Sequence, residues 1–319
     1  MLFGKFVVHP IRLPRLSLLQ NRRIQARLNK TMDQKILQND SLDEQLLREG
    51  YVVVPFLSTE ENDSLTAFFN KAHPQATEGM YATAHVQDIA FRMKMNDFIK
   101  QVFERPIAAY FQNCRSLGGS FIAKGKGERG TINPHQDWNI VDEDKFRSFN
   151  IWVPLVDLNP DNGAIMVLAN SHTWLKTYRS ANISSAYQKV SPLLWETLQP
   201  LYMKKGEALI YDHRLIHASG ENFSDALRLA AVFGIIPQEA EMLYYHQADE
   251  NTIEVFESSP DFFLYGNIFE GPKGLKTRTE IPYTQNWSED ELKAIVTGIP
   301  YKAPTQNISF WQRIWNFWN

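Results

Sequence analysis

Cysteine is almost absent from this 319-residue sequence, in which Cys114 is the single thiol. A disulfide within the chain is therefore excluded, and a fold held together by disulfides with it. Long apolar runs are missing too: none approaches the roughly 18–20 residues that a helix needs to span a bilayer, so we expect no transmembrane segment. An excess of one charge is also lacking, because the formal net charge is −3. Such a balance gives no general attraction to nucleic acid, and we expect no nucleic-acid partner.

The composition is ordinary for a globular protein with a sizeable core, because 44% of the residues are hydrophobic and 22% are charged. The length allows one large domain or two small ones. We place no boundary inside residues 41–300 and predict a single domain there. One lone thiol fits a reducing compartment, and we expect a cytoplasmic protein.

The two ends of the chain differ from the rest. Residues 1–40 form a basic arm, because every formal charge before Asp33 is positive. This pattern is typical of a solvated arm, or of a transit peptide that would direct import into an organelle. Residues 301–319 form an aromatic tail with Trp311, Trp315 and Trp318 on one face of a helix. The tail would dock on the protein's own body, contact a second copy in a homo-oligomer, or lie on a membrane surface.

Helices are predicted near both ends of the domain. Three are opened by capping-box pairs, in which a Ser is followed three residues later by a Glu: Ser41 with Glu44, Ser58 with Glu61, and Ser288 with Glu291. The first of them would cover residues 42–49, and Gly50 stands where its C-terminus needs a left-handed residue. A further helix is expected over residues 97–112.

Short β-rich segments separated by turn residues make up the middle of the chain. We expect strands over residues 51–56, 120–124, 149–153, 164–168, 208–211 and 229–236. Helices followed by short strands with polar turns indicate an antiparallel sandwich or barrel with helical support. After Pro237 the pattern loosens, and the aromatic-rich residues 238–285 would form a lid over a site or an edge packed by aromatics.

Two clusters of polar residues suggest chemistry. His135 alone among the eight histidines has an acid two positions later, Asp137; on a strand both side chains would share one face and could chelate a metal. His213 and His217 follow a later strand, and either could be a third ligand. Arg228 opens an apolar strand, where a buried guanidinium needs an anionic partner. A dicarboxylate would supply one, since guanidinium grips carboxylate in bidentate fashion.

These residues resemble the phytanoyl-CoA dioxygenase family, a branch of the iron(II)/2-oxoglutarate dioxygenases. That family carries H-x-D, then a distal His, then an Arg eleven residues beyond it. His217 and Arg228 are eleven residues apart, so the resemblance selects His217 rather than His213 as the third ligand. Other segments that resemble the family are residues 50–55, 134–137, 152–155, 162–163, 171–172 and 217–220.

The resemblance implies a mainly β fold, a double-stranded β-helix or jelly-roll of two antiparallel sheets over about residues 115–237, with N-terminal helices packed outside. It also implies that His135, Asp137 and His217 bind Fe(II). Two imidazoles and one carboxylate leave metal positions open for 2-oxoglutarate and O₂.

The co-substrate site follows from the same resemblance. Arg228 would hold the distal carboxylate of 2-oxoglutarate, with Ser219 as a hydrogen-bond partner. Trp152 and Gln136 would touch 2-oxoglutarate or its surroundings, although Trp152 could equally be a core residue. Lys124, Lys126 and Arg129 are expected in a solvated loop rather than on an anionic substrate.

The expected activity is hydroxylation of an unactivated C–H bond in a small-molecule or lipid-like substrate, with release of succinate and CO₂. Trp138 and Asn139 could face that substrate. Asp137 favours hydroxylation over halogenation, because halogenating relatives replace this carboxylate with a small residue. Two alternatives stay open: desaturation or epoxidation by the same oxidant, and a jelly-roll that binds metal and 2-oxoglutarate without turnover.

Overall fold

The computed structural model describes residues 35–73, 78–266, 268–283 and 287–298. The aromatic tail and all but the last residues of the basic arm lie outside these ranges, so the predictions for both ends stay predictions. Within the described part of the chain, no helix has the length and apolar character needed to cross a bilayer.

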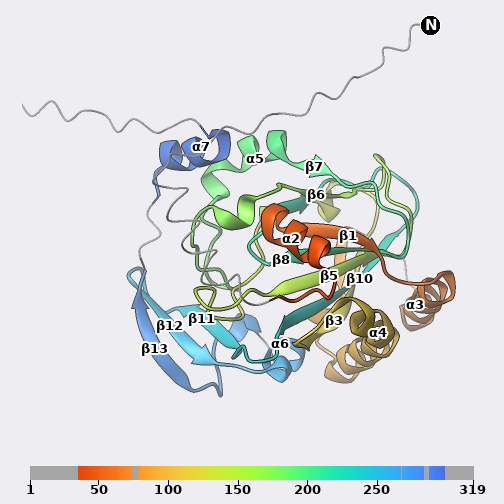
Figure 1. The fold of residues 1–319 in the computed structure, drawn as a ribbon, viewed down its shortest axis with the longest axis horizontal. Coiled ribbons are helices and arrows are strands. Elements are labelled where there is room, and N and C mark those ends of the chain that lie inside the picture. Colours follow the sequence, from red (N-terminus) through yellow and green to blue (C-terminus); the bar gives the residue numbers. More distant parts are fainter. Residues whose placement is uncertain (1–34, 74–77, 267, 284–286, 299–319) are drawn as a thin grey trace, which may run out of the picture.

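Two antiparallel sheets form the centre of the fold (Figure 1). The larger has the strand order β1-β8-β5-β10-β3-β2, and its strands are β1 (Tyr51–Pro55), β2 (Met80–Ala82), β3 (Cys114–Lys124), β5 (Phe149–Pro154), β8 (Glu207–Asp212) and β10 (Arg228–Pro237). The smaller has the order β4-β9-β6-β7, and its strands are β4 (Ile132–His135), β6 (Ile165–Val167), β7 (Gln199–Pro200) and β9 (His217–Ser219). The predicted jelly-roll is confirmed, although the sheets do not close into a barrel.

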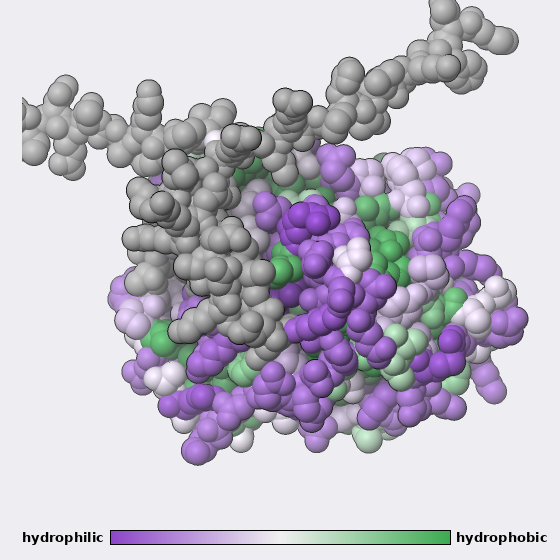
Figure 2. All heavy atoms as spheres, in the orientation of Figure 1, coloured by the Kyte–Doolittle hydropathy of each residue, from purple (hydrophilic) through white to green (hydrophobic). Residues whose placement is uncertain are grey.

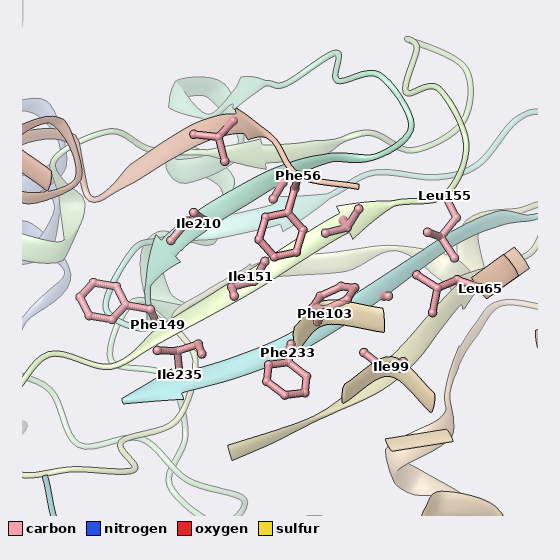
Figure 3. Packing of buried hydrophobic residues seen from close by; sticks show 14 of the residues in the cluster. Phe56, Leu65, Ile99, Phe103, Phe149, Ile151, Leu155, Ile210, Phe233 and Ile235 are labelled. Atoms are coloured by element: carbon pink, nitrogen blue, oxygen red, sulfur yellow. The ribbon is translucent and has the colours of Figure 1, made fainter. Parts of the chain in front are cut away.

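Helices cover the outer face of the larger sheet, as predicted. They are α2 (Asp40–Glu49), α3 (Thr59–Ala72) and α4 (Ile89–Tyr110). Figure 3 shows Ile99 and Phe103 of α4 lying against the sheet, and the Phe103 ring centroid is 5.7 Å from that of Phe233 and 5.2 Å from that of Phe56. Each such buried side chain stabilises the fold by about 1.5–3 kcal/mol, so this layer fixes the sheet that carries Arg228.

The capping patterns in the sequence predicted most helix ends correctly. The capping boxes at Ser58 and Ser288 are present, and Gly50 ends α2 with a φ of 84°. The prediction for Ser41 was wrong: Asn39 caps α2, since its side chain accepts from Leu42 N. The helix predicted over 97–112 begins earlier, because Asp88 accepts from Phe91 N and opens α4 at Ile89.

Residues 238–285 are more regular than their sequence pattern indicates. They contain a third antiparallel sheet, made of β11 (Leu243–Gln247), β12 (Thr252–Glu257) and β13 (Thr277–Pro282), and the helix α6 (Pro260–Tyr265). In Figure 1 this sheet lies apart from the six-stranded one. Arg92 of α4 donates to the carbonyl oxygens of Tyr265 and Gly266 at 2.9 and 3.1 Å. The end of α6 is thereby tied to α4.

The remaining helices are short. They are α5 (Ser191–Thr197), α7 (Glu289–Thr297) and the 3-10 turns η1 (Thr83–His85), η2 (Glu128–Gly130), η3 (Ser171–Thr173), η4 (Gln188–Val190) and η5 (Ile268–Glu270). Leu194 of α5 packs in one cluster with Leu292 and Val296 of α7.

On the face drawn in Figure 2, the visible coloured surface is mainly hydrophilic and its hydrophobic residues form small groups. That face therefore presents no broad apolar patch among the coloured residues.

Candidate metal centre

The pairing of β4 with β9 brings three side chains together. His135, at the end of β4, lies directly opposite His217, at the start of β9. The Nε2 atoms of both histidines are 3.8 Å from Oδ1 of Asp137, and the three potential ligand atoms lie within 4.8 Å of one another. Two atoms that each lie about 2.1 Å from one ion are at most about 4.2 Å apart. The side chains therefore need little movement to share one metal ion.

Both imidazoles are oriented by backbone carbonyl groups. Nδ1 of His135 is 2.8 Å from Asn133 O, and Nδ1 of His217 is 3.0 Å from Leu215 O. A carbonyl oxygen can only accept, so each Nδ1 carries the proton and donates it. Each Nε2 is left with a free lone pair, which is the tautomer that a metal requires.

The Asp137 carboxylate is also oriented and charged for binding a metal ion. Its Oδ2 accepts from Asn150 Nδ2 at 2.8 Å, which leaves Oδ1 for the ion. Burial raises the pKa of Asp137, but the neighbouring histidines, His217 first, outweigh it and lower that pKa to about 2. Burial, helped by His217, lowers the pKa of His135. At neutral pH the site thus holds a charged carboxylate and a neutral imidazole, the forms that bind metal.

A buried ion pair holds the backbone at Asp137. Nε of Arg179 donates to Asp137 O at 2.6 Å, and Asp137 N donates to His213 O at 2.8 Å. The Arg179 guanidinium is bound through both terminal nitrogens by the Glu143 carboxylate, and both side chains are 5% exposed. The Arg179–Glu143 pair therefore limits movement of the peptide that carries the carboxylate ligand.

Gln136 and Asn139, for which the sequence predicts ligand contacts, take part in this hydrogen-bond network. Gln136 Nε2 donates to Arg214 O, and its Oε1 accepts from Thr177 Oγ1. Asn139 Oδ1 accepts from Arg179 N, and Asn139 N donates to Arg179 O. Both residues are buried, and these hydrogen bonds brace the loop after β4.

Arg228 is buried without an anionic partner among the described residues. Its side chain is 2% exposed, and its Nε and one terminal nitrogen have no hydrogen-bond partner there. The guanidinium carbon lies 5.3 Å from the centre of the Trp152 ring, so that ring forms one wall around it. Burial lowers the pKa of Arg228 to about 10. Because unsatisfied buried donors are rare, this guanidinium fits a site for a bound anion.

Lys124 is a residue that the sequence did not reveal. It was expected in solvent together with Lys126 and Arg129, which are exposed, but its side chain is fully buried. The β3–β10 register places it directly opposite Arg228. Its Nζ donates to the Ser219 hydroxyl and to the carbonyl oxygens of Ser219 and Gly220. Ser219 is therefore already engaged by a lysine.

Two cations thus lie close together in the interior, and neither forms an ion pair with a described carboxylate. Burial, and next the charge of Arg228, lower the pKa of Lys124 to about 7. An anion with two carboxylates would compensate both charges.

Comparisons with known proteins give a consistent family. The family model for phytanoyl-CoA dioxygenase matches residues 32–230. The chain is 26% identical over 157 residues to phytanoyl-CoA dioxygenase domain-containing protein 1 of Danio rerio, covering 47% of this chain and 53% of that protein. It is 30% identical over 150 residues to phytanoyl-CoA dioxygenase 1 of Oryza sativa subsp. japonica, covering 44% and 53%. The chain spans about half the length of these relatives.

Among solved structures, the chain is similar to the non-heme alpha ketoglutarate dependent carbocyclase SnoK from nogalamycin biosynthesis. The identity is 15%, the TM-score is 0.47, and the match covers 64% of this chain and 86% of that one.

The first prediction separates the two candidate third ligands. His217→Ala is expected to weaken Fe(II) binding at least 100-fold, since it removes one of three ligand atoms, whereas His213→Ala should retain binding within about threefold. Anaerobic titration with Fe(II), followed by equilibrium dialysis and metal analysis, measures both. The reverse pattern would assign the ligand to His213.

The second prediction concerns the Arg179–Glu143 pair. The double variant Arg179→Met/Glu143→Met removes both buried charges together, so neither is left unpaired. We expect it to bind Mn(II) about 10–100-fold more weakly, because support of a ligand is lost. The control is Arg278→Met/Glu241→Met, which removes an ion pair at the surface. Equal affinity of the two variants would show that the buried pair does not position Asp137.

Proposed function

This chain belongs to the phytanoyl-CoA dioxygenase family, and from that premise we propose that it is an iron(II)- and 2-oxoglutarate-dependent dioxygenase. It hydroxylates an unactivated C–H bond of a small-molecule or lipid-like substrate and releases succinate and CO₂. One observation carries the proposal: a cluster of two histidines and one carboxylate shares the fold with a buried guanidinium, two of whose nitrogens have no hydrogen-bond partner in the described part of the chain.

In this proposal His135, Asp137 and His217 hold Fe(II). Three protein ligands leave positions for 2-oxoglutarate and O₂. The bound iron and co-substrate supply the oxidising chemistry, and the protein orients the ligands, positions the target carbon and excludes water. Asn150 orients the carboxylate, and the two backbone carbonyls described above orient the imidazoles.

The second half of the site binds the co-substrate. Arg228 grips the distal carboxylate of 2-oxoglutarate in bidentate fashion, and Lys124 adds a second positive charge beside it. Ser219 holds the Lys124 ammonium in place and stays within reach of the same carboxylate. Trp152 closes the site beneath the guanidinium. A dianion thereby offsets two charges whose burial is otherwise unfavourable.

The test is succinate release from the Fe(II)-loaded full chain, supplied with 2-oxoglutarate and O₂ and screened against a varied metabolite library. We expect succinate to form with the wild type and to be absent with His217→Ala. A product heavier by one oxygen indicates hydroxylation, or epoxidation where the compound contains a C=C bond, whereas loss of two hydrogens indicates desaturation. Binding of metal and 2-oxoglutarate with no succinate from any compound would favour a binding protein without turnover.

The third prediction concerns the guanidinium. Arg228→Ala should raise the concentration of 2-oxoglutarate needed for half-saturation by a factor of about 100, because a paired charge is lost from a buried site. Equilibrium binding of 2-oxoglutarate to the Mn(II)-loaded chain measures this without turnover. Arg129→Ala, at an exposed arginine, is the matched control. An unchanged requirement in Arg228→Ala would remove this residue from the site.

The fourth prediction is a pH dependence. Since the Lys124 pKa is lowered to about 7, the ammonium that attracts a dianion is present below this pH and is lost above it. Affinity for 2-oxoglutarate should therefore fall as pH rises from about 7 to 9, by at most tenfold per unit. Lys124→Met should bind 2-oxoglutarate more weakly at pH 6.5 and should lose this decline. A decline of equal size in both proteins would assign the effect to another group.

A further inference from the structure

A cavity of about 300 Å³ lies beside Asp137. Its floor comes from the larger sheet, where Gly118 pairs with Gly234 and Gly234 pairs with Asn150 across three neighbouring strands. Its other walls include Phe263 from α6. The cavity therefore connects the carboxylate of the metal centre with the segment that follows the jelly-roll.

Two leucine side chains pack closely over the glycines of this floor. A Cβ on Gly118 would lie 2.5 Å from the Leu264 side chain, and one on Gly234 would lie 2.8 Å from the Leu117 side chain. Both leucines line the cavity. Any larger residue at either glycine would push a leucine or fill the space itself, so the two glycines set the room that a ligand has.

The lining is mostly apolar. The residues that line the cavity include no lysine, arginine or glutamate, and Asp137 is their one carboxylate. Trp138 lies in this lining, as predicted for a residue that faces substrate, together with Ile140, Val232 and Met242. An anionic group placed here would lose its hydration and gain no cation.

One polar group in the lining has no partner. The His213 side chain is 4% exposed, its Nδ1 is 3.0 Å from the Ser148 hydroxyl, and its Nε2 is buried with no hydrogen-bond partner among the described residues. Of the other polar lining residues, Asn150 is engaged with Asp137. An unsatisfied nitrogen buried in the wall of a ligand-sized cavity points to a polar atom of the ligand, which it reaches by a small movement of the ring.

We propose that the substrate is an uncharged, mainly hydrocarbon molecule that carries an alcohol group, and that His213 Nε2 hydrogen-bonds the oxygen of that group. A hydroxyl suits either tautomer of His213, because it donates to a lone pair and accepts from an N–H. The hydrocarbon portion packs against Leu117, Leu264 and Phe263, which line the cavity. The inference rests on the proposed function, which makes Asp137 a metal ligand and the cavity the place of oxidation.

The test uses three matched probes: cyclooctanol, cyclooctane and cyclooctanecarboxylate. Dissociation constants are measured by ligand-observed NMR on the metal-free full chain, so the result does not depend on turnover. Cyclooctanol should bind about tenfold more tightly than cyclooctane, the ratio that one net hydrogen bond gives. With saturating succinate present to occupy the anion site proposed at Arg228, cyclooctanecarboxylate should bind at least 100-fold more weakly than the alcohol.

Variants of His213 test whether this residue causes the preference for the alcohol over the hydrocarbon. His213→Leu should bring the ratio between alcohol and hydrocarbon close to one, while His213→Gln, which keeps a polar side chain, should retain part of it. The control His246→Leu removes a histidine that also has a buried nitrogen without a described partner but does not line the cavity; its ratio should not change.

Three results would overturn the inference: an unchanged ratio in His213→Leu, a carboxylate that binds as tightly as the alcohol, or no alcohol preference in His213→Gln when the Leu variant fails to fold.

Addition of Mn(II) then tests the metal centre separately. Paramagnetic broadening of bound cyclooctanol is expected. Its absence, with the alcohol preference intact, would count against the metal site and leave the substrate class standing.

Discussion

Two positive charges side by side in the interior are the constraint on which the rest of the structure depends. Desolvating Arg228 and Lys124 without a counter-anion costs several kcal/mol for each ion, and their mutual repulsion adds to this. The strands that carry them, β10 and β3, form the most extensive pairing in the larger sheet. The aromatic layer between that sheet and α4 stabilises this pairing from the other side (Figure 3). In the proposed function, the bound co-substrate offsets this cost.

The metal ligands depend on a different support. β4 and β9 have four and three residues, and such short strands give little rigidity of their own. Their geometry is secured by hydrogen bonds to ligand atoms and ligand peptides, from Asn150 and Arg179 among others. Hydrogen bonds suit this role because they fix the orientation of a ligand group, whereas apolar packing fixes the position of the strand that carries it.

Features fixed by residues close together in the sequence could be predicted, whereas features fixed by residues far apart in the sequence could not. Gly50 and Ser58 act on their own helix ends, so local rules located them. The grouping of His135, Asp137 and His217 could be predicted because the spacing between His217 and Arg228 matches that of a known family. Lys124 could not be recognised without the register that places it opposite Arg228. The hydrogen-bond partners of Gln136 and Asn139 could not be predicted for the same reason, since Thr177 and Arg179 lie about 40 residues away.

The tie between α6 and α4 has a consequence for the diversification of this protein. Met242, Phe263 and Leu264, which wall the cavity, all follow residue 230, where the match to the family model ends. The residues proposed to hold iron and co-substrate all lie before that point. Exchange of this later segment could therefore redirect the catalyst to a different molecule while the oxidising machinery stays intact. The lining residues that lie before that point, Trp138 and His213 among them, would stay common to all such variants.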